Sequence, residues 1–110
     1  MKVSIGEVFI EKEKLEDFGI FHPIKLVYFK EINNVIENEK TRKVKYGISI
    51  VKTDYYNNEL KVEENEIKYL SNDEEKVNEI LQFLKDKQVT PINLEEVLLD
   101  LFKEKLFNRE

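Results

Sequence analysis

The sequence lacks cysteine and tryptophan, and its 110 residues include only one histidine, three glycines and two prolines. Without cysteine it can form no disulfide framework, no thiolate nucleophile and no zinc site of the cysteine type. No stretch approaches the roughly 18 consecutive apolar residues of a membrane span, and no apolar run follows Lys2 at the N-terminus. We therefore expect neither a membrane segment nor a signal peptide, and we expect a cytoplasmic protein.

The scarcity of glycine also excludes several cofactor- and metal-binding motifs. Gly6, Gly19 and Gly47 lie far apart, so the sequence contains no glycine-rich phosphate loop and no dinucleotide fingerprint. The acidic runs at residues 63–66 and 73–75 lack the alternating oxygen ligands and the turn glycine of a calcium loop. We expect no cofactor and no metal site.

The composition is that of a folded and strongly charged chain. Apolar residues make up 41% of it, including seven phenylalanines and five tyrosines, which argues against disorder. Residues 1–56 carry ten basic and nine acidic side chains, whereas residues 57–110 carry eight and fourteen, so the net charge of −5 arises in the C-terminal half. The length predicts one domain over residues 1–110, and the negative charge disfavours nucleic acid as a partner.

Alternation of apolar and polar residues predicts strands in the first part of the chain. They cover residues 2–10, with a bulge at Gly6, residues 24–32 and residues 44–52. The strand at 24–32 is apolar on both faces, which is typical of a strand that is central in its sheet or covered on two sides.

Shorter signals complete this part of the chain. Residues 11–17 predict either a loop or a short helical turn, and the runs Asn33-Asn34 and 37–40 predict a turn. Asn57-Asn58 predicts a hairpin. One or two further strands are indicated by the apolar pairs Leu60/Val62 and Ile67/Tyr69.

The pattern changes to helical periodicity at Ser71. Ser71 and Glu74 form a capping-box pattern, followed by an apolar stripe that ends near Lys87: Val77, Ile80, Leu81 and Leu84. Thr90-Pro91 opens a second helix, with Asn93 and Glu96 as a competing start. Its apolar face is broad and comprises Leu94, Val97, Leu98, Leu101 and Phe102, widened by Leu99 and Leu106.

Strands followed by helices predict an α+β fold with an antiparallel sheet. We expect about four to five strands, mainly within residues 1–70, and two C-terminal helices within residues 71–107. The helices should pack on the sheet face that carries Tyr46, Ile48 and Ile50.

No residue pattern specifies a reaction. His22, the single histidine, has three serines as conceivable nucleophilic partners, Ser4, Ser49 and Ser71, but none lies in a Gly-x-Ser-x-Gly elbow. Asp100 interrupts an apolar run, which is typical of the polar face of an amphipathic helix. We therefore predict no catalytic residue and favour a protein that is not an enzyme.

Two surface features suggest binding. The only basic cluster contains Lys40, Arg42, Lys43 and Lys45, which could meet phosphates but more often forms a solvated strand face that prevents sheet aggregation. Tyr55 and Tyr56 flank the predicted hairpin and could anchor a partner, although strand alternation favours one pointing inward.

Three segments together resemble a known family. They are Tyr46-Gly47-Ile48-Ser49-Ile50, Ser71-Asn72-Asp73-Glu74 with its helix, and Val89-Thr90-Pro91-Ile92-Asn93-Leu94. They are similar to segments of a family of short uncharacterised proteins of low-GC Gram-positive bacteria, over roughly residues 24–102. The resemblance implies no activity and no site residue.

The leading hypothesis is a small protein-binding or regulatory domain whose partner is another protein or a second copy of the chain. Its predicted interaction surface comprises Tyr55, Tyr56, Leu98, Leu99 and Phe102, because exposed apolar area marks interfaces. The alternative is a small-molecule binder or enzyme with a pocket between sheet and helices, using Tyr46, His22, Asp100 or the acidic loops. The third hypothesis is weak nucleic-acid binding through the basic cluster.

Overall fold

Four long strands follow one another along the chain and pair in that same order. In the computed structural model, which describes residues 1–36 and 42–103, they form one antiparallel sheet of order β1-β2-β3-β4, comprising β1 (Lys2–Ile10), β2 (Ile24–Ile36), β3 (Arg42–Tyr55) and β4 (Leu60–Ser71). Each strand pairs with its neighbour in sequence because short connections favour antiparallel meanders. β2 and β3 are therefore central, and β1 and β4 are the edges.

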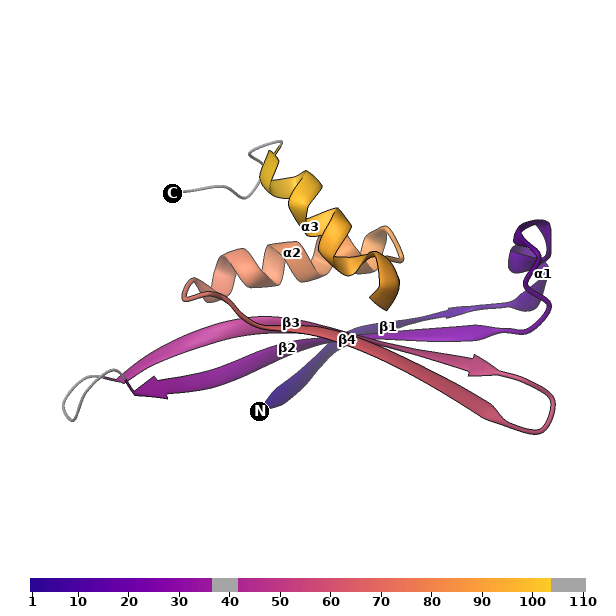
Figure 1. The fold of residues 1–110 in the computed structure, drawn as a ribbon, viewed down its shortest axis with the longest axis horizontal. Helices are drawn as coiled ribbons and strands as arrows, with labels where there is room; N and C mark the ends of the chain where they lie inside the picture. The colour runs from indigo at the N-terminus through magenta and orange to yellow at the C-terminus, as the bar shows by residue number, and fades with distance from the viewer. Residues whose placement is uncertain (37–41, 104–110) are drawn as a thin grey trace.

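The helices follow the strands and cover one face of the sheet. The described helical segments are α1 (Lys12–Leu15), the 3-10 turn η1 (Glu16–Phe18), α2 (Glu74–Asp86), the 3-10 turn η2 (Pro91–Asn93) and α3 (Leu94–Lys103). Figure 1 shows α2 and α3 on the same side of the sheet, and α1 at the end near the β3–β4 turn. The predicted α+β class, with a sheet followed by two helices on one face, is confirmed.

Two strand boundaries differ from the sequence prediction. Asn33 and Asn34, expected in a turn, continue β2 as far as Ile36, because they pair with Lys45 and Val44 of β3; the side-chain amide of Asn33 also donates to the backbone oxygen of Lys68 at 2.8 Å. Residues 37–40, the rest of that predicted turn, lie outside the described residues. The one or two short strands expected at 60–69 are a single longer strand, β4.

The start of α2 also differs. Asp73, not Ser71, is its N-cap: the carboxylate of Asp73 accepts from the backbone NH of Lys76 at 3.3 Å. The hydroxyl of Ser71 accepts from the backbone NH of Asp73 at 3.0 Å, so Ser71 ends β4 and shapes the turn before the helix. At the second predicted helix, Thr90 precedes η2, and regular α3 begins only at Leu94.

Glycine is required where β3 meets β4. A Cβ atom on Gly47 would lie 2.2 Å from the backbone oxygen of Ile67 and 2.3 Å from that of Lys68. The β3–β4 register shifts between Tyr46 and Ile48, so β4 bulges against this glycine. The bulge predicted at Gly6 is also present, as a register shift between Ser4 and Gly6 in β1.

The core lies between the helix-covered face and α2. Side chains of the central strands are fully buried there, against an equally buried stripe of α2: Leu26, Tyr28, Ile48 and Ile50 from the sheet, and Val77, Ile80, Leu81 and Leu84 from the helix. The hydroxyl of Tyr28 donates to the backbone oxygen of Val89 at 2.8 Å, which ties the sheet to the segment between α2 and α3.

Candidate functional site

A groove runs between the edge strand β4 and helix α3. Its volume is about 410 Å³, and its lining is apolar except for one acidic residue: Ile67 and Leu70 from β4, and Glu95, Leu98, Leu99 and Phe102 from α3. We call it the β4–α3 groove. It brings together three residues that the sequence predicted as an interaction surface, because Leu98, Leu99 and Phe102 all line it.

Helical geometry explains why α3 leaves apolar surface uncovered. Leu94, Leu98 and Leu101 recur at helical spacing and are buried in the core. Leu99 follows Leu98 by about 100° around the axis, so it points away from that core and is 60% exposed, against 3% for Leu98. The groove therefore pairs a packed interior with an apolar rim that the described chain leaves in water.

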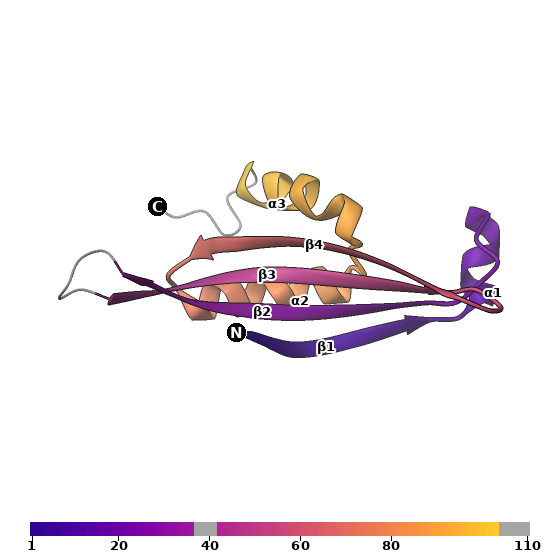
Figure 2. The ribbon, with the colours of Figure 1, turned by 60° about the horizontal axis from the view of Figure 1, so that its bottom comes forward.

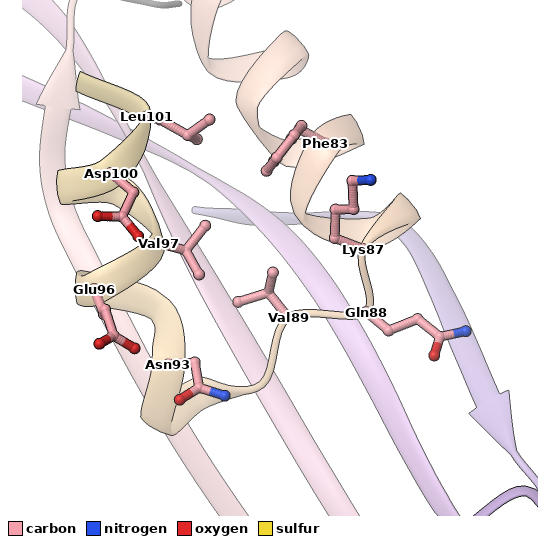
Figure 3. Close-up of a pocket in the computed structure, with 9 residues that line it drawn as sticks. All are labelled: Phe83, Lys87, Gln88, Val89, Asn93, Glu96, Val97, Asp100 and Leu101. Atoms are coloured by element: carbon pink, nitrogen blue, oxygen red, sulfur yellow. The ribbon is translucent and has the colours of Figure 1, made fainter. Parts of the chain in front are cut away.

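A second and larger groove, of about 650 Å³, lies between α2 and α3 (Figure 3). In Figure 3, Val97 and Leu101 point from α3 toward Phe83 on α2, and Val89 projects from the connection between the helices. Polar side chains surround this apolar centre, namely Lys87, Gln88, Asn93, Glu96 and Asp100. We call it the α2–α3 groove.

The end of α2 fixes one wall of the α2–α3 groove. Gln88 adopts a left-handed φ of 54°, and the backbone NH of Val89 donates to the oxygen of Leu84 at 3.0 Å, as in a helix-terminating turn. On the opposite wall, Glu96 and Asp100 lie one turn apart, both exposed, and within the described ranges neither forms an ion pair. Lys87 lies 5.9 Å from the ring centre of Phe83.

The sheet face opposite the helices carries no helix (Figure 2). An ion pair crosses it from edge to edge: the ammonium of Lys2 on β1 donates to the carboxylate of Glu64 on β4. Glu64 also accepts from the hydroxyl of Ser49 at 3.0 Å, and Lys2 lies 5.7 Å from the ring centre of Phe29. The hydrogen bond between them raises the pKa of Lys2 and lowers that of Glu64, so both groups stay charged at neutral pH.

Glu31 lies under this polar network. It is only 4% exposed, and its Oε2 atom has no hydrogen-bond partner among the described residues. Burial, with the nearby charge of Glu66, raises the pKa of the Glu31 carboxyl, and the charges of Lys2 and Lys68 offset part of that effect. No feature of the sequence singled out Glu31, because its charged neighbours Lys2, Glu66 and Lys68 lie far from it along the chain.

His22 pairs with a carboxylate rather than with a serine. Its Nε2 atom lies 2.7 Å from Oδ1 of Asp54, and its ring centre lies 4.2 Å from that of Tyr56. Across the described ranges, none of the three serines hydrogen-bonds to His22, and Ser49 is engaged with Glu64. The pair joins the start of β2 to the end of β3.

The two predicted tyrosines lie at the same end of the sheet, near α1 (Figure 1). Tyr56 is 41% exposed, whereas Tyr55 is half-buried and its ring centre lies 6.1 Å from that of Phe9. Of the predicted basic cluster, Lys43 is exposed and Lys45 half-buried on β3. Arg42 begins that strand, and Lys40 lies outside the described residues.

Neither a metal site nor a membrane helix is found where the chain is described. No group of three or more histidine, cysteine, aspartate or glutamate side chains there is arranged to hold a metal ion. None of the described helices combines the length and the apolar character that a membrane span requires.

Comparison with known proteins gives a family but no activity. No curated protein and no solved structure matches the chain. The model of DUF6514, described as a family of unknown function, matches residues 7–104. That match includes the last four residues of β1, the three other strands and both C-terminal helices. Because it spans far more than half of the chain, this protein belongs to DUF6514, a family of unknown function.

Proposed function

We propose that the protein is a cytoplasmic protein-binding module without catalytic activity, and that a different protein docks on α3 at the β4–α3 groove. The observation that carries the proposal is the apolar rim of this groove, above all Leu99 with 60% of its surface exposed. Contiguous exposed apolar surface marks interaction sites in soluble proteins.

The position of the groove supports this choice over the opposite sheet face. On the opposite face the chain's own ion pair, Lys2 with Glu64, lies across the central strands and uses their polar groups. In the β4–α3 groove the lining side chains are apolar apart from Glu95, so burying them requires little loss of hydration.

Site-specific photocross-linking in the native cells tests the proposal. A photoreactive amino acid at Leu99 should cross-link one discrete partner, and the same amino acid at Glu79, exposed on α2, should not. The partner is then purified and its affinity for the isolated protein is measured. Leu99→Asp should weaken that affinity at least tenfold, whereas Glu79→Lys should leave it unchanged.

Two results would contradict the proposal. An affinity that does not respond to Leu99→Asp would remove the groove as the docking site. A cross-link that joins two copies of this chain would assign the surface to self-association and not to a different protein. Because Leu99 is exposed, its substitution should leave the fold intact, which thermal unfolding would check.

A small-molecule ligand in the α2–α3 groove is the second candidate. Its volume of about 650 Å³ lies in the range of ligand sites, and Lys87 stands opposite Glu96 and Asp100 around an apolar centre. A metabolite screen by thermal shift tests it: a ligand should raise the melting temperature of the protein but not that of Val97→Asp. A screen without any such ligand would remove this candidate.

A further inference from the structure

The outer edge of β4 is an unused site for strand pairing. β4 is the last strand of the sheet, and within the described ranges it pairs only with β3. In an antiparallel ladder, every second residue directs its backbone NH and C=O away from the neighbouring strand. Residues 60–64 are exposed, and so are Glu66, Lys68 and Tyr69 beside the groove, so the edge of β4 is accessible to another chain along most of its length.

Besides its open edge, β4 has the β4–α3 groove beside it, where side chains of an added strand could bind. Figure 1 shows α3 on the helix-covered side of the sheet, and Figure 2 shows it next to β4, at the end of the sheet farthest from β1. A strand added to β4 would lie about 4.8 Å from it, alongside the β4–α3 groove. Its side chains alternate between the two faces of the sheet, so every second one would reach the apolar rim formed by Leu99 and Phe102.

The acidic residues of β4 favour a basic partner segment. Glu63, Glu64 and Glu66 follow one another closely on this strand, and Glu95 lies at the groove. Glu64 pairs with Lys2 and Glu63 with Lys52, whereas in the described part of the chain Glu66 and Glu95 form no ion pair. An added strand with lysine or arginine between its apolar residues would complement this edge.

The same charges argue against a second copy of this chain as the added strand. Antiparallel pairing of β4 with β4 of another copy, in the register centred on Asn65, would set the acidic run at residues 63–66 opposite itself, and like charges in that position destabilise a sheet. The other edge strand, β1, is interrupted by its register shift between Ser4 and Gly6, which protects an edge from pairing.

We infer that the partner contributes an extended peptide segment, with alternating apolar and basic residues, that adds to β4 as a fifth strand beside the β4–α3 groove. This inference rests on the proposed function and specifies how the partner is held. Backbone hydrogen bonds to the edge supply affinity, and the alternate side chains in the groove supply specificity.

The probe is a displayed library of random ten-residue peptides selected against the intact protein. Selected peptides should alternate apolar residues with lysine or arginine. In ¹H–¹⁵N spectra of the protein, they should shift the amide signals of β4 and α3 more than those of β1. Glu66→Lys should weaken the best peptide at least fivefold, and Glu79→Lys, the same charge change on α2, should not.

Backbone methylation distinguishes strand addition from simple contact with the groove. Two versions of the best peptide carry N-methyl groups on alternate amides, one set facing β4 and the other facing away. One version should lose at least tenfold in affinity and the other should change little, because only one set donates to the edge.

Each result decides a different claim. If both methylated peptides bind equally well and still shift α3 signals, the groove binds peptides but strand addition is wrong. If the library yields no binder, or only peptides that shift signals elsewhere, both the strand addition and the proposed docking site are overturned.

Discussion

The two faces of the sheet bury their central residues by different means. On the helix-covered face, Tyr28 and Ile48 are fully buried by the apolar stripe of α2. On the opposite face, Ser49 and Glu31 are also buried, but beneath a polar network in which Lys2 reaches across to Glu64. The first face depends mainly on apolar packing, whereas the second depends mainly on charged and polar contacts.

This difference between the faces shows where the fold leaves apolar surface exposed. On the opposite face, the ion pair of Lys2 and Glu64 lies over the buried Ser49 and Glu31. On the helix side, apolar surface stays uncovered where α3 passes the β4 edge, and Leu99 is the most exposed apolar residue of that groove. The comparison of the faces thus supports the β4–α3 groove as the docking site.

The largest expected effect comes from removing packing on the helix-covered face. Leu81→Ala should lower the free energy of unfolding by about 2–5 kcal/mol, because Leu81 is fully buried and its loss leaves a cavity. Leu99→Ala should change it by less than about 0.5 kcal/mol. Urea unfolding measures both, and comparable losses in the two variants would mean that α3 is packed as tightly as α2.

A glycine substitution tests how closely β3 and β4 must approach. Gly47→Ala should cost about 1–3 kcal/mol, because the added methyl group would lie only 2.2 Å from a backbone oxygen that cannot rotate away. Gly19→Ala is the control: Gly19 has a φ of 79° but open space around it, so only the strain of about 1 kcal/mol applies. A smaller loss at Gly47 than at Gly19 would contradict the observed bulge.

The sequence predicted the fold well and the site only in part. Strand alternation around Ile48 and the stripe from Val77 to Leu84 depend on local spacing, which a sequence displays directly. The turn expected at Asn33 was wrong, because backbone pairing of Asn33 with Lys45 on β3, supported by its side-chain hydrogen bond to Lys68, overrides the preference of asparagine for turns.

The β4–α3 groove could be predicted only in part for the same reason, because it depends on contacts between residues far apart in the sequence. The sequence identified Leu98, Leu99 and Phe102 from the breadth of one helical face, but the groove also needs Ile67 and Leu70 from β4. Their proximity to α3 depends on the path of the chain through η2, where the side chain of Asn65 donates to the backbone oxygen of Pro91 at 3.1 Å. No local pattern encodes such a contact.

Removal of one hydroxyl tests the polar link on the helix-covered face. Tyr28→Phe should cost about 1–2 kcal/mol near neutral pH, since it leaves the buried oxygen of Val89 without its donor. Burial raises the pKa of the Tyr28 phenol above its ordinary value of 10.0. The unfolded chain therefore releases this proton first.

The pH dependence of that variant follows from the same shift. The contribution of the neutral Tyr28 is complete below about pH 10 and declines as the pH rises further. The stability of the wild type should thus fall more steeply above this pH than that of Tyr28→Phe. Parallel curves in urea unfolding from about pH 9 to pH 11 would contradict the burial of the phenol.

The smallest effect, and the only gain, is expected on the opposite face. Glu31→Gln should raise the free energy of unfolding at about pH 7 by roughly 1 kcal/mol or less, because it removes a buried charge with an unpartnered oxygen. The folded chain raises the pKa of Glu31 above its ordinary value of 4.5, so it holds that proton more tightly than the unfolded chain does. The free energy of unfolding of the wild type therefore declines as the pH rises from 4.5 toward the raised pKa of Glu31 in the folded chain.

The advantage of Glu31→Gln should accordingly appear as the pH rises above about 4.5 and should be absent near pH 3.5, where the carboxyl is protonated in both states. Lys2→Met provides the matched control, because it removes the charge that partly offsets the burial of Glu31 and should enlarge the gain from Glu31→Gln. A loss of stability in Glu31→Gln at neutral pH would show that the charged carboxylate is an essential member of the network. The polar face would then depend on Glu31 as strictly as the helix-covered face depends on Leu81.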